Sequence, residues 1–281
     1  MLKDRVMFMS GGSRGIGLAI AARAARDGVR VALMAKTAEP HPKLPGTIYT
    51  AAEEIEAAGG EALPIVGDIR DAEAVDAAVA QTVERFGGID LVVNNASAIN
   101  LAPMRDLEVK RFDLMQQINA RGTFVVTRAC LPHLRESDHP HVLTLSPPLS
   151  ADPRWLVGHS AYTLSKMGMT MITLGVAADE AEAGVAANCL WPRTIIATAA
   201  VQNLLGGDEA MARSRVPDIV ADAAYEILGR DPRECTGNTF IDDEVLAEAG
   251  ITDLDRYAGT PDGDMALDIF VDGWPEPAAT G

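Results

Sequence analysis

Two ionisable side chains spaced four residues apart, Tyr162 and Lys166, are the strongest candidates for chemistry in this chain. On a helix, residues i and i+4 lie on one face, so the phenol and the ammonium can project into one site. A nearby cation favours the phenolate and lowers the pKa of the phenol, which suits Tyr162 to pass a proton near neutral pH. Because a Tyr-x-x-x-Lys pair alone is usually an ordinary helical pair, its meaning depends on the rest of the chain.

A glycine-rich turn near the start of the chain provides that context. The apolar run Val6–Met9 predicts a buried strand, and the Ala-rich run Leu18–Ala25 predicts a helix. Gly11 permits a tight turn, while Gly15 and Gly17 let the backbone approach a pyrophosphate and let the helix pack on the strand. Free N–H groups and the positive end of the helix dipole favour phosphate there. We therefore expect nucleotide binding by the turn, which consists of Ser10, Gly11, Gly12, Ser13, Arg14, Gly15, Ile16 and Gly17.

The glycine spacing Gly-x-x-x-Gly-x-Gly and the Tyr-x-x-x-Lys pair together resemble the short-chain dehydrogenase/reductase family, from Met1 to Ile241. The resemblance implies a Rossmann-like, doubly wound parallel sheet and reversible hydride transfer between a nicotinamide cofactor and a carbonyl or alcohol. It also implies that Tyr162 donates or accepts the proton, while Lys166 lowers its pKa and holds the cofactor ribose. The alternative from another class is a regulatory protein of the same fold that binds the nucleotide without turnover.

Two asparagine positions extend the resemblance. Asn94-Asn95-Ala96-Ser97 is similar to the family's Asn-Asn-Ala-Gly, which supports the sheet and lines the cofactor, with Ser97 in place of the glycine. Asn119 matches the family asparagine that holds a water beside the catalytic lysine. A helix interior disfavours Asn because its side chain competes for backbone hydrogen bonds, so a polar residue there indicates a specific role, with a plain helix kink as the alternative.

Two further segments match cofactor-contacting positions of the family. Asp68-Ile69 resembles the family's Asp-Val, whose acid caps the adenine edge. Pro192 and Ile195 occupy the place of a loop that lies against the carboxamide, with Arg193 where the family has glycine. The resemblance implies that the backbone of Ile195 keeps its contact with the cofactor.

The substrate-binding serine of the family has two candidates here. Ser150 stands twelve residues before Tyr162 and fits by spacing, whereas Ser146 ends the fifth predicted strand and fits by context. Pro147 replaces the usual second serine of a pair. We expect Ser146 to line the site as a catalytic residue, and Ser150 remains the alternative.

The charges after the second predicted strand favour NADP over NAD. NAD enzymes place a carboxylate at the end of this strand to hold the ribose 2′-hydroxyl. Here the strand is followed by Ala35-Lys36-Thr37, without an acid, and Arg14 lies in the glycine turn. Two cations without a carboxylate fit a 2′-phosphate, so NAD is the less favoured cofactor.

Two proline-containing segments resemble one branch of the family more closely. Residues 35–50 carry Pro40, Pro42 and Pro45, and Ser146-Pro147-Pro148-Leu149 follows the fifth strand. Together they are similar to the hydroxysteroid dehydrogenase-like protein 2 branch. Members of that branch can carry a C-terminal sterol-carrier domain and a peroxisomal address, and from the last residues, 277–281, we expect neither here. The branch resemblance does not define a substrate.

Strand and helix patterns alternate along most of the chain, which predicts an α/β fold with a parallel sheet covered by helices on both faces. We expect a single dinucleotide-binding domain over residues 1–243. A tail, 244–281, would pack on the surface or at a subunit contact, with residues 275–281 disordered. Three prolines oppose a long helix in residues 37–50, which we expect to form an ordered or semi-ordered excursion. The Ala, Leu and Met content of residues 199–216 predicts a lid over a small or lipid-like apolar substrate.

The boundaries expected for these elements follow from the apolar runs. The helical patterns are Ala51–Ala58, Ala72–Phe86, Arg111–Arg135 and Asp218–Leu228. The predicted strands are Val6–Met9, Val29–Met34, Glu61–Val66, Asp90–Asn95, His141–Ser146, Val185–Trp191 and Asn238–Ile241.

Composition limits the partners and the compartment. The 281 residues carry a net charge of −16, which disfavours nucleic acid and anionic membranes as partners. The three cysteines lack paired spacing and the five histidines lack a metal-binding motif, so we assign no disulfide and no metal. The first residues lack a signal-peptide pattern. We expect a cytoplasmic homodimer or homotetramer that acts on a small molecule.

Overall fold

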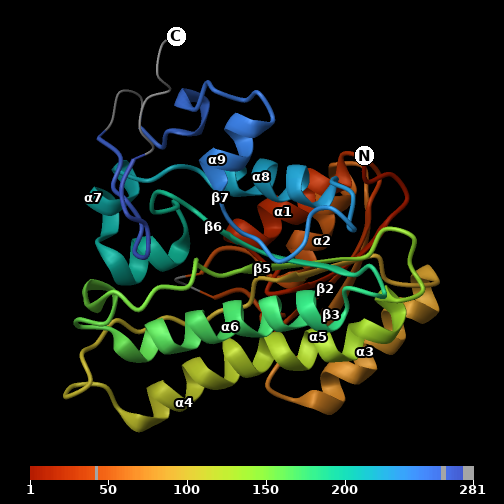
Figure 1. The fold of residues 1–281 in the computed structure, drawn as a ribbon, viewed down its shortest axis with the longest axis horizontal. Helices are drawn as coiled ribbons and strands as arrows, with labels where there is room; N and C mark the ends of the chain where they lie inside the picture. The colour runs from red at the N-terminus through yellow and green to blue at the C-terminus, as the bar shows by residue number, and fades with distance from the viewer. Residues whose placement is uncertain (42–43, 261–263, 275–281) are drawn as a thin grey trace.

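A computed structural model describes residues 1–41, 44–260 and 264–274 of the chain. A seven-stranded sheet runs through the middle of the molecule in the order β3-β2-β1-β4-β5-β6-β7, and all neighbouring strands are parallel (Figure 1). The strands are β1 Val6–Ser10, β2 Arg30–Ala35, β3 Glu61–Val66, β4 Leu91–Asn94, β5 His141–Leu145, β6 Ala186–Trp191 and β7 Thr239–Ile241. The order reverses between β1 and β4, so the crevice for a ligand is expected at the carboxyl ends of these two strands.

Helices cover both faces of the sheet, as the alternating pattern predicts. In Figure 1, α1, α2, α8 and α9 lie on one side, and α3, α4, α5 and α6 on the other. The helices are α1 Gly15–Ala25, α2 Ile48–Ala57, α3 Ala72–Phe86, α4 Val109–Ile118, α5 Ala120–Leu134, α6 Ser160–Asp179, α7 Gly207–Ala212, α8 Asp218–Leu228 and α9 Asp242–Glu248. Three short turns complete the described elements: η1 Pro153–Trp155, η2 Val201–Leu205 and η3 Asp255–Tyr257.

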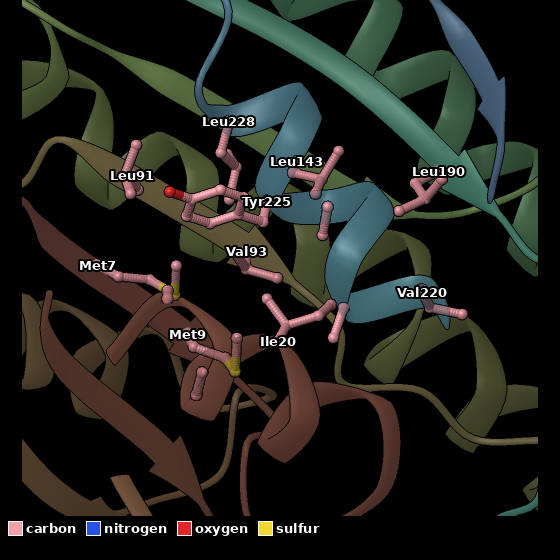
Figure 2. Packing of buried hydrophobic residues seen from close by; sticks show 14 of the residues in the cluster. Met7, Met9, Ile20, Leu91, Val93, Leu143, Leu190, Val220, Tyr225 and Leu228 are labelled. Carbon is pink, nitrogen blue, oxygen red and sulfur yellow. The ribbon is translucent and has the colours of Figure 1, made fainter. Parts of the chain in front are cut away.

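Successive side chains of a strand pack on opposite faces of the sheet and contribute to two separate hydrophobic cores. Met7 and Met9 of β1 pack toward α1 and α8, whereas Phe8 between them packs toward α3 and α5. This division follows from the strand period of two. Figure 2 shows the first core, in which the strand residues Met7, Met9, Leu91, Val93, Leu143 and Leu190 meet Ile20 of α1 and Val220, Tyr225 and Leu228 of α8.

Several predicted boundaries needed correction. The helix expected over 111–135 is two helices, because the backbone at Asn119 (φ −72°, ψ −78°) separates α4 from α5. Helix α2 begins at Ile48, three residues before the helix expected from Ala51 and after the last of the three prolines. The reason is a reciprocal pair of hydrogen bonds, in which the Thr47 and Thr50 side chains each accept from the other's backbone N–H. Most strand ends differ from the prediction by a single residue.

The C-terminal tail does not stay on the surface as expected. Helix α9 crosses the predicted boundary at 243, and its Val245 and Leu246 are fully buried in the first core. Residues 264–274, which we call the strap, return to the carboxyl end of the sheet. Their backbone is tied by the Ala266 and Asp268 N–H groups, which donate to the carbonyls of Arg213 (2.9 Å) and Arg193 (2.8 Å). The predicted disorder of residues 275–281 lies outside the described residues.

No helix in the described ranges is both long enough and apolar enough to cross a bilayer.

Candidate active site

Helix α6 carries Tyr162 and Lys166 in its first two turns, as their spacing predicts. The side chains are 5% and 3% exposed, so both groups are removed from bulk water. The Lys166 Nζ donates to the carbonyl of Leu145 at the end of β5 (2.8 Å) and lies 5.2 Å from the ring centre of Trp191. Burial lowers the pKa of Lys166 to about 7. The ammonium is therefore held by the sheet at the carboxyl end of β5.

The lowered pKa expected for the Tyr162 phenol is not found in this structure. Burial raises the pKa of Tyr162 above its ordinary value, and the Asp268 carboxylate of the strap raises it further. The spacing argument counted the nearby cation but not the loss of water around the phenol. The strap, which the sequence did not predict near Tyr162, accounts for part of this burial.

Asn119 lies where the chain passes from α4 to α5, and its side chain is fully buried. Its Oδ1 accepts from the Ala98 N–H (2.7 Å), and its Nδ2 donates to the Ala98 carbonyl (3.0 Å) and to Ser165 Oγ (2.8 Å). The amide thus connects the loop after β4 with the residue next to Lys166. This position is compatible with the expected role beside the catalytic lysine.

The two candidate serines lie in different surroundings. Ser146 is fully buried, and its Oγ accepts a hydrogen bond from Thr170 of α6 (2.9 Å). Ser146 was expected to line the site. The structure instead directs its hydroxyl into the packing under α6, because the chain turns at the end of β5. Ser150 instead lines a groove of about 400 Å³ beside the strap. Of the two, only Ser150 borders open space.

The glycine turn packs against the end of β4 through contacts that exclude side chains. A Cβ on Gly11 would lie 2.7 Å from Ala96 Cα, and one on Gly17 would lie 2.4 Å from Asn95 Nδ2. Asn95 also donates to the Gly11 carbonyl (2.8 Å), and the Ala96 N–H donates to Ser10 Oγ (3.3 Å). The structure therefore brings the predicted Ser10, Gly11, Gly17, Asn95 and Ala96 together.

The start of helix α1 fits a phosphate group. Arg14 is its N-cap residue, no side chain caps the first N–H groups, and the first turn carries no acid. Such an N-terminus attracts anions through its N–H groups and its dipole. A Cβ on Gly15 would meet Thr198 Cγ2 at 3.4 Å, so the base of the expected lid reaches this turn. Thr198 was not predicted, and its only signal in the sequence is its position just before residues 199–216.

The remaining residues of the predicted cofactor site differ in exposure, and the structure does not bring all of them to this turn. Ser13 and Pro192 are buried, Ile16 is half-buried, and Ser97 is exposed just after β4. Ile69 is buried against α5, where a Cβ added to Gly122 would lie 2.5 Å from its Cδ1.

The charges expected around the ribose are partly paired with one another. The cofactor prediction relied on there being no carboxylate near Lys36. In the structure Lys36 Nζ lies 3.3 Å from Asp68 Oδ2, so a carboxylate is present beside it. Arg70, which the sequence did not single out, also pairs with Asp68 (2.5 Å) and holds the pKa of that carboxyl well below its usual range. Arg14 donates to the carbonyls of Pro45 (3.0 Å) and Gly46 (3.1 Å). Cations still outnumber carboxylates here.

The loop after β6 is fastened to the strap. The Ile195 N–H, expected to face the cofactor, donates to the Ala266 carbonyl (3.1 Å). Arg193 is 4% exposed and pairs with Asp243 (2.6 Å) and Glu244 (2.5 Å) of α9, and its backbone N–H donates to Asp242 (2.9 Å). At the position of the family's glycine, Arg193 thus acts as a structural ion-pair centre.

The strap places an aromatic ring over Tyr162. The ring centre of Phe270 lies 6.3 Å from that of Tyr162, with the two planes 26° apart. The Trp191 Nε1 donates to the Ile269 carbonyl (2.8 Å), which fixes the strap beside this ring. These contacts close the site above the phenol. The described residues include no group of three or more His, Cys, Asp or Glu side chains placed to hold a metal ion.

The chain is similar to known proteins along most of its length. The family model described as short chain dehydrogenase matches residues 5–207. The hydroxysteroid dehydrogenase-like protein 2 of Danio rerio is 52% identical over 270 residues, which are 96% of this chain and 64% of that protein. The chain therefore spans less than two thirds of that relative's length.

Two solved structures are also similar. A short chain dehydrogenase from Mycobacterium thermoresistibile is 59% identical, with a TM-score of 0.94 and 100% of both chains covered. A blue fluorescent protein from a metagenomic library, crystallised in complex with NADPH, is 27% identical, with a TM-score of 0.73 over 85% of this chain and 96% of that one. The match to the first of these extends through the strap.

Proposed function

The chain belongs to the short-chain dehydrogenase family, and we propose that it is an NADP-dependent oxidoreductase that interconverts a carbonyl and an alcohol on a small or lipid-like apolar substrate. The observation that carries the proposal is the position of Tyr162 and Lys166 on one face of α6. Asn119 contacts the same helix through Ser165, and the glycine turn packs against the neighbouring end of β4. The activity and substrate of the longer relatives are not transferred to this chain.

In the proposed mechanism the phenol of Tyr162 moves the proton. In the direction of reduction its O–H gives the proton to the substrate oxygen, and in the direction of oxidation the phenolate takes it back. The bound nicotinamide supplies or accepts the hydride. Turned from the Leu145 carbonyl toward the phenol, the Lys166 ammonium would lower the pKa of Tyr162. Asn119 would hold the loop after β4 and α6 at a fixed distance during this movement.

NADP is the cofactor that the charges support. Arg14 stands at the start of α1, and Lys36 and Arg70 share the single carboxylate of Asp68. This surplus of positive charge suits a 2′-phosphate better than a 2′-hydroxyl. A solved structure 27% identical to this chain contains NADPH. NAD remains the less favoured cofactor.

The test compares the wild type with Tyr162→Phe on a panel of aldehydes, ketones and alcohols, followed by cofactor absorbance. We expect Tyr162→Phe to lower kcat by about 10²–10⁴-fold on any substrate that the wild type converts, because the proton donor is lost. Tyr49→Phe is the matched control, since Tyr49 is 50% exposed on α2. Near-normal turnover by Tyr162→Phe would show that the assignment is wrong.

A regulatory protein that binds the nucleotide without turnover is the second candidate. Two observations favour this candidate. Tyr162 is buried away from any substrate, and the Ile195 N–H donates to the strap, so that it is not available to a cofactor. Tight binding of NADPH without turnover across the whole panel would support this candidate.

We also propose that the protein is a cytoplasmic homodimer or homotetramer. Phe124 of α5 and Leu164 and Met171 of α6 are large apolar side chains that are 51%, 57% and 64% exposed. A second copy would bury them. The three cysteines are buried and unpaired, which suits a reducing compartment. Light scattering coupled to size exclusion measures the oligomeric state.

A further inference from the structure

Phe270 of the strap lies at the centre of a cluster of aromatic rings. Its ring centre is 5.9 Å from that of Trp155, 6.1 Å from His159, 6.3 Å from Tyr162 and 5.8 Å from Trp191. Phe270 is 5% exposed, and Tyr162 beneath it is sealed to the same degree. A substrate oxygen can reach the phenol only if something in this cluster moves.

The backbone of Phe270 is held in an unfavourable conformation. Its φ of +72° lies in the left-handed region, and in the described ranges Asp4 is the only other non-glycine residue with positive φ. A side chain with a Cβ pays free energy for this conformation, so the neighbouring structure must enforce it. Hydrogen bonds to the strap from Ile195 and Trp191, and from Asp268 to the Arg193 carbonyl, supply that enforcement. Strain concentrated in one residue over a catalytic group indicates a functional role.

A groove of about 400 Å³ lies against Phe270. Phe270 is one of its lining residues, whereas Tyr162 is not. Its apolar lining consists of Pro148, Leu149, Trp155, Ile241, Val271 and Trp274. Ser150, Arg193, Glu244 and Asp272 also line this groove, so its surface is mixed. The phenyl ring therefore separates a groove with an apolar wall and a polar wall from the phenol that carries the proton.

We propose that Phe270 is a plug whose ring occupies the position that a flat, apolar ring of the substrate takes during the reaction. The substrate class is then a ketone, or the matching secondary alcohol, whose reacting carbon is attached to such a ring. The space that Phe270 leaves is walled by Trp155, His159 and Trp191, and aromatic walls favour offset or edge-on contacts with another ring. The remainder of the substrate lies in the groove. This inference rests on the proposed function, since it concerns how the substrate oxygen meets Tyr162.

The test measures binding of two ketones with equal carbon number, acetophenone and 2-octanone, by ligand-observed NMR titration of the NADP⁺-saturated protein. A plug that must open lowers the apparent affinity by the fraction of open molecules. Phe270→Ala removes the plug, and we expect it to bind acetophenone about tenfold or more tightly than the wild type, as for an open form that is a minor state of about 10% or less. The gain for 2-octanone is expected to be smaller, and Phe270→Trp should bind acetophenone more weakly than the wild type.

Leu267→Ala is the control, because Leu267 belongs to the same strap but is 37% exposed. It should bind both ketones as the wild type does. If Phe270→Ala fails to fold, Phe270→Gly replaces it, since glycine adopts the left-handed backbone readily. Unchanged or weaker acetophenone binding by the folded variant overturns the plug.

The outcome separates this inference from the proposed function. A tenfold gain in acetophenone affinity without turnover in any variant would show that Phe270 occupies the place of an aromatic ligand, and would contradict the enzyme together with the assignment of that ligand as its substrate. Turnover that Tyr162→Phe abolishes, combined with no gain in affinity for Phe270→Ala, would support the enzyme and overturn the plug.

Discussion

The proposed cofactor end of the site, at the glycine turn, and its proposed substrate end, at the strap, are held together by different kinds of contact. We call them the cofactor end and the substrate end. At the cofactor end the main chain dominates, because Gly11 and Gly17 approach Ala96 and Asn95 too closely for any added Cβ. At the substrate end side chains dominate, with Phe270 among four rings and Arg193 among acids. The cofactor end depends on glycines, whose lack of a side chain allows the backbone segments to approach. The substrate end depends on large side chains that contact one another.

This difference determines how each end responds to substitution. A close backbone approach fails when one methyl group is added, whatever the charge of the new side chain. A buried ion pair fails when one partner is removed, because the other charge stays in a medium of low polarity. Adding a methyl group at the cofactor end and removing an ion-pair partner at the substrate end therefore test the two kinds of contact separately.

The largest effect is expected from Arg193→Met. Arg193 and Asp243 are both about 5% exposed and lie 2.6 Å apart. Among the residues that the structure describes, the substitution leaves this buried carboxylate with one remaining ion-pair partner, Arg215 at 3.8 Å. Removal of one partner of such a pair costs about 3–5 kcal/mol. Urea unfolding should show a loss of this size, together with weaker attachment of the strap to the loop after β6.

Arg105→Met provides the control for that measurement. Arg105 and Asp106 are 84% and 59% exposed, and surface pairs of this kind contribute roughly 0–1 kcal/mol. Equal losses of stability for the two variants would mean that Arg193 does not fasten the substrate end.

Local signals in the sequence explain which parts of the fold were predictable. Helix α3 was predicted with its correct bounds from its apolar pattern. The structure shows that local residues set these bounds, because Asp71 caps the first N–H groups and Gly87 ends the helix with φ +90°. The glycine turn is equally local. The break at Asn119 was predicted only as an alternative, a helix kink, because apolar periodicity continues across it and only the backbone angles reveal the division.

The substrate end could not be predicted because its contacts join residues far apart in the chain. Phe270 meets Tyr162, and Ile269 meets Trp191, across stretches of sequence that carry no spacing signal. The pairing of Lys36 with Asp68 is of the same kind, since each residue lies at the end of a different strand. A motif places a residue on an element, but the packing of elements decides what that residue meets.

An intermediate effect is expected at the cofactor end from Gly17→Ala. The added Cβ would lie 2.4 Å from Asn95 Nδ2 and 2.8 Å from the Gly11 carbonyl, and the second of these contacts is with backbone that cannot rotate away. Overpacking of this kind costs about 1–3 kcal/mol. Loss of the Asn95–Gly11 hydrogen bond should also weaken NADPH binding, which calorimetric titration measures.

Gly175→Ala is the matched control for Gly17→Ala. Gly175 lies inside α6, and no atom within 4 Å opposes a Cβ there, so alanine should be neutral or stabilise the helix by up to about 1 kcal/mol. If Gly17→Ala binds NADPH as tightly as Gly175→Ala does, the cofactor end does not depend on close backbone approach.

The smallest effect is expected from Arg14→Ala, which tests charge rather than shape at the cofactor end. Arg14 is the N-cap residue of α1 and is held toward residues 45 and 46 by two hydrogen bonds. If its guanidinium also meets the 2′-phosphate, the variant should bind NADPH about tenfold more weakly and NADH nearly as before, since tenfold corresponds to about 1.4 kcal/mol, near the low end for one charge-assisted hydrogen bond. Arg26→Ala, which removes the same charge from the other end of α1, should change neither constant. Equal dissociation constants of the wild type for NADPH and NADH at one ionic strength would contradict the preference, and would leave the positive charge around Asp68 without a role in cofactor choice.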